Sequence, residues 1–438
     1  EGATQPKNGV EDVLAIAERF GFGPEAIARI RAVISDADLG EGVSLARYGS
    51  GLPRTKGQEF EEAVREVFGV RYVLPVSSGT GALHSAFVAA GVGPGTEVIC
   101  PAVGFFATAA AVVQAKGIPI FCDVDESMTM DPAKIEALIT PRTVALAPTH
   151  VMGMVCDKDP IMAVARKHNL MVIEDCAQAP GARYKGRLVG TIGDLGAFSI
   201  SCYKIIGAGE GGMVITHDER LWERAAGLAE CGGLWREPRF APPRYPGELF
   251  CGTNYRMSEL DAAVNVNQVK KLTAVVERYH NAMMRVLSQL RRFREIVPQK
   301  LNDVAGEVGY MIRFFPQTVE LSQRIVNALS AEGIRAWMYH PGSPDWHIYS
   351  HLFAIMDRTG ATAEGCPYTC PYYAEKGGRI EYTRTECPVA DDLYRRDVMV
   401  SLGQWLTERD CDNIARGINK VLAAYCTEDP AAKGWLGA

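Results

Sequence analysis

The sequence predicts an α/β protein in which a mostly parallel sheet is covered by helices, followed by a smaller α+β domain. Apolar stretches of strand length, such as 72–76, 96–103 and 170–178, alternate with helical patterns of about ten residues. A long amphipathic helical pattern begins after Ser258, and a strand–helix–strand pattern follows it at 308–342. The chain has 438 residues, a length that suits about two or three domains.

We expect three regions along the chain. Residues 1–45 form an N-terminal helical extension, because 11–35 contains two short helical patterns separated by the turn GFGP. Residues 46–270 form the large α/β domain, and residues 271–438 form the small domain. Within the small domain, 341–386 is rich in Pro, Tyr, Gly and charged residues without clear periodicity, so we interpret it as a long insertion and a candidate lid.

The composition is that of an ordinary globular protein and argues against several kinds of partner. The net charge is −6, which argues against nucleic acid. No apolar run reaches the roughly 18 residues that a membrane span needs, and the first residues lack the basic and apolar regions of a signal peptide. The twelve cysteines are scattered without a CxxC pair, which favours free thiols in a reducing cytoplasm.

Lys204 lies in the most informative stretch, 193–212, which reads GDLGAFSISCYKIIGAGEGG. An apolar run ends near this lysine and a glycine-rich segment follows, so the amine is expected in a cleft where backbone can approach a ligand closely. Lysine forms Schiff bases with carbonyl compounds, including pyridoxal phosphate. A lone lysine after a strand is usually a surface residue, and the functional interpretation depends on whether other stretches complete a cofactor site.

The turn SSGTG predicts a phosphate site, because it joins a strand to a helix. Gly79 and Thr80 then lie at the helix N-terminus, where free N–H groups and the helix dipole attract anions. The hydroxyls of Ser78 and Thr80 can add hydrogen bonds. The alternative is a plain strand–helix turn with a serine cap.

Other candidate residues follow the ends of apolar strands. Asp175 ends the run LMVIED, where a carboxylate could hold the protonated pyridine nitrogen of pyridoxal phosphate. Gln178 could face the same cavity, His150 could line it, and Phe105 or its neighbour could stack on a planar ring. His347 and His351 have the i, i+4 spacing of metal ligands, but no third ligand is evident, so we expect no metal and interpret both as structural or substrate-facing.

Seven stretches in order resemble the sugar aminotransferases of the DegT/DnrJ type, which use pyridoxal phosphate. They read KGQEFEEAVREVFG, VSSGTGALHSAF, VICPAVGFFATAAAV, PTHVMG, VIEDCAQAPGA, GDLGAFSISCYKIIGAGEGGMV and GTNYRMSELDAAV. The resemblance covers residues 45–300 well and the last forty or so moderately. It implies the aspartate aminotransferase-like fold (fold type I), with a seven-stranded-type, mostly parallel sheet in the large domain.

The resemblance also implies roles for individual residues. Lys204 would form the internal aldimine and shuttle a proton, and Asp175 would pair with the pyridine nitrogen. Gln178 would contact the ring hydroxyl side and Phe105 would stack on the ring. The phosphate would be bound by Gly79, Thr80, Ser199 and, from a second subunit, Asn254. Such shared active sites imply a homodimer or a larger assembly.

The predicted reaction is ping-pong transfer of an amino group from L-glutamate or L-glutamine to a keto or aldehyde sugar. Nucleotide-linked sugars, aminocyclitol precursors and sugar acids all stay open as acceptors, and the candidate substrate-facing residues are His150, Tyr203, Arg236 and His340. One alternative is a dehydratase-like enzyme of the same fold, although related sugar dehydratases have histidine where this chain has Lys204. Another is a non-catalytic protein that binds pyridoxal phosphate or a sugar. A Rossmann enzyme is disfavoured because SSGTGA lacks the GxGxxG spacing.

Overall fold

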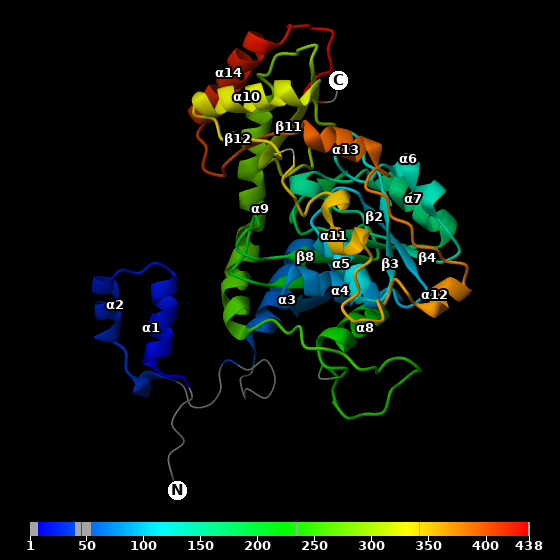
Figure 1. The fold of residues 1–438 in the computed structure, drawn as a ribbon. Coiled ribbons are helices and arrows are strands. Elements are labelled where there is room, and N and C mark those ends of the chain that lie inside the picture. Colours follow the sequence, from blue (N-terminus) through cyan, green and yellow to red (C-terminus); the bar gives the residue numbers. More distant parts are fainter. Residues whose placement is uncertain (1–7, 40–44, 46–53, 234, 341, 437–438) are drawn as a thin grey trace.

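The computed structural model describes residues 8–39, 45, 54–233, 235–340 and 342–436, and Figure 1 shows their arrangement. A seven-stranded sheet forms the centre of the larger body. The long helix α9 (Glu259–Leu287) runs from this body to a second, four-stranded sheet. Ser258 caps α9 by accepting the N–H of Asp261, as the sequence pattern indicated.

The large sheet has the strand order β1-β9-β8-β5-β4-β2-β3. Five neighbouring strands from β8 to β3 run parallel, whereas β9 is antiparallel to both β1 and β8. The mostly parallel, seven-stranded sheet predicted from the sequence is therefore confirmed. Its strands are β1 (Tyr72–Val76), β2 (Glu97–Pro101), β3 (Ile118–Cys122), β4 (Thr143–Leu146), β5 (Met171–Asp175), β8 (Leu195–Ser199) and β9 (Gly212–Thr216).

Strand β9 shows how the alternation of side chains builds two buried faces. Val214 belongs to the core under α4, α5 and α8, whereas Met213 and Ile215 belong to the core under α3 and α9. Because both faces are covered, the strands read as nearly continuous apolar runs. The helices of this body are α3 (Lys56–Phe68), α4 (Gly79–Ala89), α5 (Ala107–Gln114), α6 (Pro132–Ile135), α7 (Lys158–His168) and α8 (Glu219–Ala229), with the short turns η2 (Glu136–Leu138) and η3 (Val151–Gly153) and the hairpin β6 (Arg183–Tyr184) and β7 (Arg187–Leu188).

The second sheet is antiparallel, with the order β10-β11-β13-β12. Its core gathers Phe314 from the sheet, Val286 from α9 and Ile418 from the last helix. The sheet strands are β10 (Ile296–Pro298), β11 (Met311–Pro316), β12 (Ala336–Trp337) and β13 (Val398–Ser401), covered by α10 (Val319–Ala331) and α14 (Glu408–Tyr425). The domain boundary predicted at residue 270 falls inside α9, so a continuous helix links the two sheets.

The segment 342–386, within the predicted insertion, is mostly irregular in structure. It carries short helical turns and packs on the edge of the large sheet. The hydroxyl of Tyr373 donates to Glu97 Oε1 at 2.6 Å, and that of Tyr382 donates to the carbonyl of Pro119 at 2.7 Å. These contacts place the segment against β2 and the edge strand β3. The elements here and just beyond are η4 (Tyr349–His351), α11 (Phe353–Met356), α12 (Pro371–Glu375) and α13 (Pro388–Arg395).

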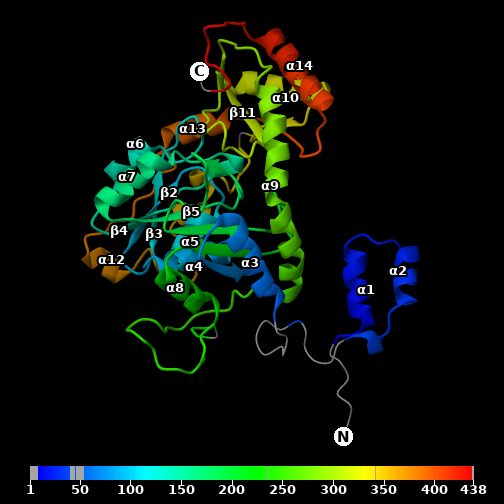
Figure 2. The same ribbon diagram turned by 180° about the vertical axis from the view of Figure 1, so that it is seen from behind.

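The N-terminal region contains the two expected short helices, α1 (Val10–Arg19) and α2 (Pro24–Arg31), followed by η1 (Asp36–Asp38). They pack on each other through a small apolar cluster of their own, and Figures 1 and 2 draw them beside the main body. The predicted boundary between residues 45 and 46 lies next to segments outside the described residues. Among the described helices, none combines the length and the apolar character that crossing a bilayer requires.

Arg313 of β11 and Asp397 form an ion pair that is fully buried in the small domain. The guanidinium Nε donates to Asp397 Oδ2 at 3.0 Å. Removing one partner leaves a buried charge, so we expect Asp397→Leu to lower the free energy of unfolding by about 3–5 kcal/mol, measured by denaturant titration. The double variant Arg313→Met/Asp397→Leu should recover most of this loss. Equal losses in the single and double variants would contradict the assignment.

Candidate active site

Lys204 lines a cavity between the large sheet and the strand β11 of the small sheet. The lysine lies in the loop after β8, and β8 runs parallel to β5, so Lys204 and the residues after β5 meet beyond the same edge of the sheet. The residues that line this space, called the Lys204 cavity below, are Met152, Ala177, Gln178, Tyr203, Lys204, Ile205, Tyr279, Tyr310, Met311 and His347.

Burial lowers the pKa of the Lys204 amine from its ordinary value, although the charges of Asp175 and Glu210 act in the opposite direction. A lowered pKa raises the fraction of neutral amine at a given pH, and only the neutral amine can act as a nucleophile or accept a proton. The cavity therefore holds a lysine prepared for covalent and acid–base chemistry.

Asp175 is the last residue of β5 and is only 3% exposed. Its Oδ1 accepts the N–H of Ala177 at 3.0 Å, and its Oδ2 accepts the hydroxyl of Thr108 at 2.6 Å. These two bonds fix the plane of the carboxylate, two residues before the cavity wall begins at Ala177. The sequence alone did not identify Thr108 as a site residue. The signal that could have identified it is a hydroxyl in the first turn of α5, the helix that follows β2.

Gln178 lines the Lys204 cavity, and its side chain is anchored. Its Oε1 accepts the N–H of Met152 at 2.8 Å, and its backbone carbonyl accepts the hydroxyl of Tyr310 at 3.2 Å. Met152 has a φ of 50°, in the left-handed region. The amide of Gln178 thus holds a strained turn that forms part of the same wall.

Ser78, Gly79 and Ser199 lie close together where β1 and β8 end and β9 begins. Ser78 caps α4 by accepting the N–H of Gly81 at 3.0 Å, which leaves Gly79 and the exposed Thr80 in the first turn. A Cβ on Gly79 would lie 2.6 Å from the Cβ of Ser199, and a Cβ on Gly212 would lie 2.4 Å from the carbonyl of Ser78. Only glycine permits this close approach, which brings Ser199 beside the helix N-terminus.

Phe105 and Asn254, both expected around the cofactor, do not line the Lys204 cavity. Phe105 is 37% exposed, and its ring centroid lies 5.3 Å from that of His347. Asn254, which the resemblance assigned to a second subunit, accepts the N–H of Arg256 of its own chain at 3.1 Å.

The candidate substrate-facing residues are dispersed. Tyr203 lines the cavity and is 90% exposed. Arg236, by contrast, is buried and donates to the carbonyls of Ala241 and Pro242 at 2.5 and 2.8 Å, so it holds its own loop closed. His340 is exposed and does not line the cavity. For Arg236 and His340 the structure therefore differs from the sequence expectation.

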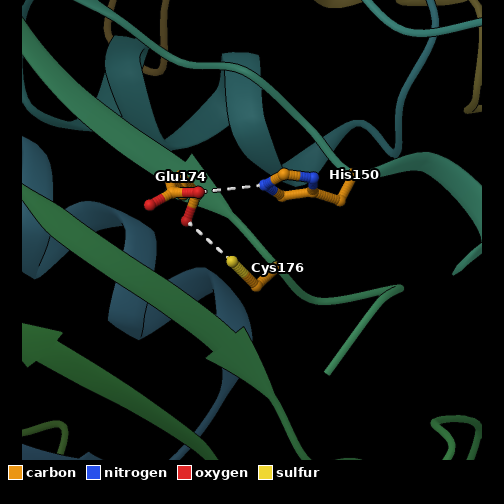
Figure 3. Close-up of side chains that lie close together, drawn as sticks. All are labelled: His150, Glu174 and Cys176. Atoms are coloured by element: carbon orange, nitrogen blue, oxygen red, sulfur yellow. Dashed lines mark hydrogen bonds and ion pairs between the residues drawn. The ribbon is translucent and has the colours of Figure 1, made fainter. Parts of the chain in front are cut away.

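His150 also differs from that expectation. It is fully buried beside Glu174 of β5 and does not line the Lys204 cavity (Figure 3). Its Nδ1 accepts the N–H of Cys156 at 3.1 Å, so Nε2 carries the hydrogen and donates to Glu174 Oε2, also at 3.1 Å. Glu174 Oε1 accepts the N–H groups of residues 192 and 193, and Lys158 Nζ lies 3.4 Å from Oε2. Burial acts to raise the pKa of the Glu174 carboxyl, but Lys158 and His150 outweigh it and hold this pKa below its ordinary value.

His150, Glu174 and Cys176 lie close enough together to raise the question of a metal site (Figure 3). Two observations argue against it. Burial raises the pKa of the Cys176 thiol well above its ordinary value, and a protonated thiol is a poor ligand. The carboxylate of Glu174 is already surrounded by donors, one of them the ammonium of Lys158, which would repel a cation. The cluster is a buried ion pair with hydrogen bonds.

Comparison with known proteins identifies the family. The model of the DegT/DnrJ/EryC1/StrS aminotransferase family matches residues 49–419. A GDP-perosamine synthase of Caulobacter vibrioides is 44% identical over 306 residues, covering 67% of this chain and 78% of the relative. A protein of Micromonospora echinospora described as a putative L-glutamine:3-amino-2,3-dideoxy-scyllo-inosose aminotransferase is 38% identical over 369 residues, covering 80% and 83%.

Among solved structures, that of 3-amino-5-hydroxybenzoic acid synthase has the same fold. It superposes with a TM-score of 0.68 at 26% identity, covering 84% of this chain and 91% of that chain. The fold agrees with the fold type I expectation, and members of this family use pyridoxal phosphate. The chain therefore belongs to the DegT/DnrJ/EryC1/StrS aminotransferase family and is a pyridoxal-phosphate-dependent transaminase.

Proposed function

We propose that this transaminase moves an amino group from L-glutamine or L-glutamate to the carbonyl group of a sugar or cyclitol by a ping-pong mechanism. The observation that carries the proposal is Lys204, a lysine with a lowered pKa in a cavity beside the fixed carboxylate of Asp175. The names of the two relatives support the substrate class, because one is a synthase of a GDP-linked amino sugar and the other uses a keto-cyclitol with L-glutamine.

The residues present fit pyridoxal phosphate. The crowded approach of Gly79 and Gly212 to their neighbours leaves backbone N–H groups at the start of α4 for a phosphate. Asp175 supplies a buried carboxylate for a protonated ring nitrogen. When bound, pyridoxal phosphate supplies a carbonyl carbon for an amine and an electron-poor ring that stabilises negative charge on carbon.

Each residue then has a task in the reaction. Lys204 Nζ is the Schiff-base lysine, and once released its neutral amine accepts and returns a proton. Asp175, held by Thr108 and by the N–H of Ala177, keeps a proton on the ring nitrogen. Ser199 and the first turn of α4 would hold the phosphate of bound pyridoxal phosphate.

We also propose that the enzyme acts as a homodimer in the cytoplasm. The exposure of Tyr203, immediately before Lys204, supports a second copy near the mouth of the cavity, since this aromatic surface is open in the single chain. The cytoplasm is supported by the twelve cysteines, which are all free thiols.

The first test is an absorbance experiment on the purified enzyme. We expect a near-visible band of bound cofactor that shifts on addition of L-glutamine or L-glutamate, because the donor half-reaction aminates the cofactor. Addition of 3-amino-2,3-dideoxy-scyllo-inosose should then restore the band, and GDP-perosamine should drive the reverse half-reaction if the acceptor is nucleotide-linked. A band that ignores both amino acids would sink the donor assignment. A donor response without any response to either sugar compound would remove the proposed acceptor class.

Substitution of the lysine gives a second test. We expect Lys204→Ala to lose the absorption band of lysine-bound cofactor and at least about 10³-fold of the turnover, because both covalent attachment and proton transfer need its amine. Lys185→Ala is the matched control, since Lys185 is exposed and pairs with Asp159. Full turnover by Lys204→Ala would end the proposal.

Thr108 gives a third test, through the affinity for the cofactor. Thr108→Val removes the hydroxyl that donates to Asp175, and a hydrogen bond to a charged group is worth about 1.5–3 kcal/mol. We therefore expect pyridoxal phosphate to bind the apoprotein about tenfold more weakly or worse, measured by equilibrium titration. Thr108→Ser keeps the hydroxyl and should bind nearly as the wild type does. Unchanged affinity in Thr108→Val would show that this hydroxyl does not position Asp175.

A further inference from the structure

The segment 345–349 contributes His347 to the lining of the Lys204 cavity. It runs antiparallel to the residues that follow β2, with a β-bridge between Val103 and Ile348. The N–H of Gly104 donates to the carbonyl of His347 at 2.9 Å, and the N–H of Phe106 donates to the carbonyl of the preceding residue, Trp346, at 2.8 Å. These backbone bonds hold the segment in place without any ligand, so the position of His347 is built into the fold.

The imidazole of His347 is itself oriented by a carboxylate. Its Nδ1 lies 2.8 Å from Asp345 Oδ1, and the same oxygen accepts the backbone N–H of His347 at 2.7 Å. Burial acts to raise the pKa of the Asp345 carboxyl, but its bond with His347 outweighs burial and holds the pKa below its ordinary value. An ionised carboxylate only accepts hydrogen bonds, so Nδ1 carries a hydrogen, and in the neutral imidazole Nε2 then keeps a lone pair.

The surroundings of His347 suit a hydroxylated ring. The imidazole lines the same cavity as Lys204 and Gln178. Tyr279 and Tyr310 line the same cavity, and the ring centroid of Phe105, outside the lining, lies 5.3 Å from that of His347. Aromatic walls with a few oriented polar groups are the usual composition of a small-molecule site, because the walls bury the ring and the polar groups select it.

A metal role for His347 and His351 finds no support in this geometry. The Nδ1 of His351 accepts the N–H of Asp345 at 3.0 Å, and the Nδ1 of His347 faces the carboxylate of the same residue. The two histidines therefore make different hydrogen bonds with Asp345. It is anchored by His351 and in turn orients His347, which alone of the two lines the cavity.

We propose that His347 is a specificity-determining residue, whose Nε2 accepts a hydrogen bond from a hydroxyl group of the acceptor sugar or cyclitol. Asp345 is the positioning residue that selects the required tautomer. This inference rests on the proposed function, because it concerns the carbonyl acceptor and not the amino donor. A site built to receive a hydroxyl rejects rings that lack it, since the imidazole nitrogen would then be left unpaired.

The kinetic test separates the two half-reactions. We expect His347→Asn to lower kcat/KM for 3-amino-2,3-dideoxy-scyllo-inosose about tenfold, because the shorter amide cannot reach the position of Nε2. His347→Gln should retain most of the activity, since its amide oxygen reaches that position. Both variants should keep the wild-type rate in the donor half-reaction with L-glutamine. The matched control is His351→Asn, which keeps an acceptor for the N–H of Asp345 and lies outside the cavity lining.

A second measurement reads the tautomer without turnover. In ¹⁵N spectra of histidine-labelled enzyme, with the His347 signals identified by their loss in His347→Gln, Nε2 should be unprotonated and Nδ1 protonated. Asp345→Ala should mix the two tautomers. The opposite tautomer, or full activity of His347→Asn toward the cyclitol, overturns the assignment and leaves the proposed function standing. A wild type that reacts with L-glutamine but with neither the cyclitol nor GDP-perosamine overturns both.

Discussion

Two consecutive carboxylates at the end of β5 constrain the whole site. Strand alternation sends Glu174 and Asp175 to opposite faces of the sheet. Glu174 meets Lys158 and His150 on the side of α7, and Asp175 meets Thr108 on the side of α5. Each carboxylate is buried and would be costly without its partners. The end of β5 is therefore bonded to a helix on each face of the sheet, and the Lys204 cavity lies next to it.

The cavity is completed from distant parts of the chain. Lys204 comes from the loop after β8, whereas Met311 is the first residue of β11 in the small sheet and Tyr310 precedes it. His347 comes from a segment whose backbone is joined to the loop after β2. The division of labour follows from this arrangement. The large sheet supplies the groups that we propose carry the cofactor chemistry, and the later part of the chain supplies His347, which we propose recognises the acceptor.

Much of the fold and part of the site could be predicted because their signals are local. The alternation of apolar strands with helices predicts the parallel sheet, and the cap at Ser258 predicts the start of α9. Lys204 and the serine–glycine turn at 78–81 are recognisable because each stands at the end of a strand. Thr108 could not be found in this way, and for His347 the sequence left both a structural and a substrate-facing interpretation open. A threonine in an apolar helix and a histidine in an irregular segment acquire a role only from the carboxylates that they meet.

The sequence by itself determined the fold class, the family and the lysine around which the cavity is built, since periodicity and motif spacing are properties of short stretches. Only the tertiary structure decided which polar residues face the cavity. In the structure, His150 bonds to Glu174 and Arg236 bonds to the carbonyl of Ala241 in its own loop. His347 lines the same cavity as Gln178. The physical reason is that a buried polar group must satisfy its hydrogen bonds with whatever lies nearby. Its neighbours are fixed by long-range packing, which no local pattern records.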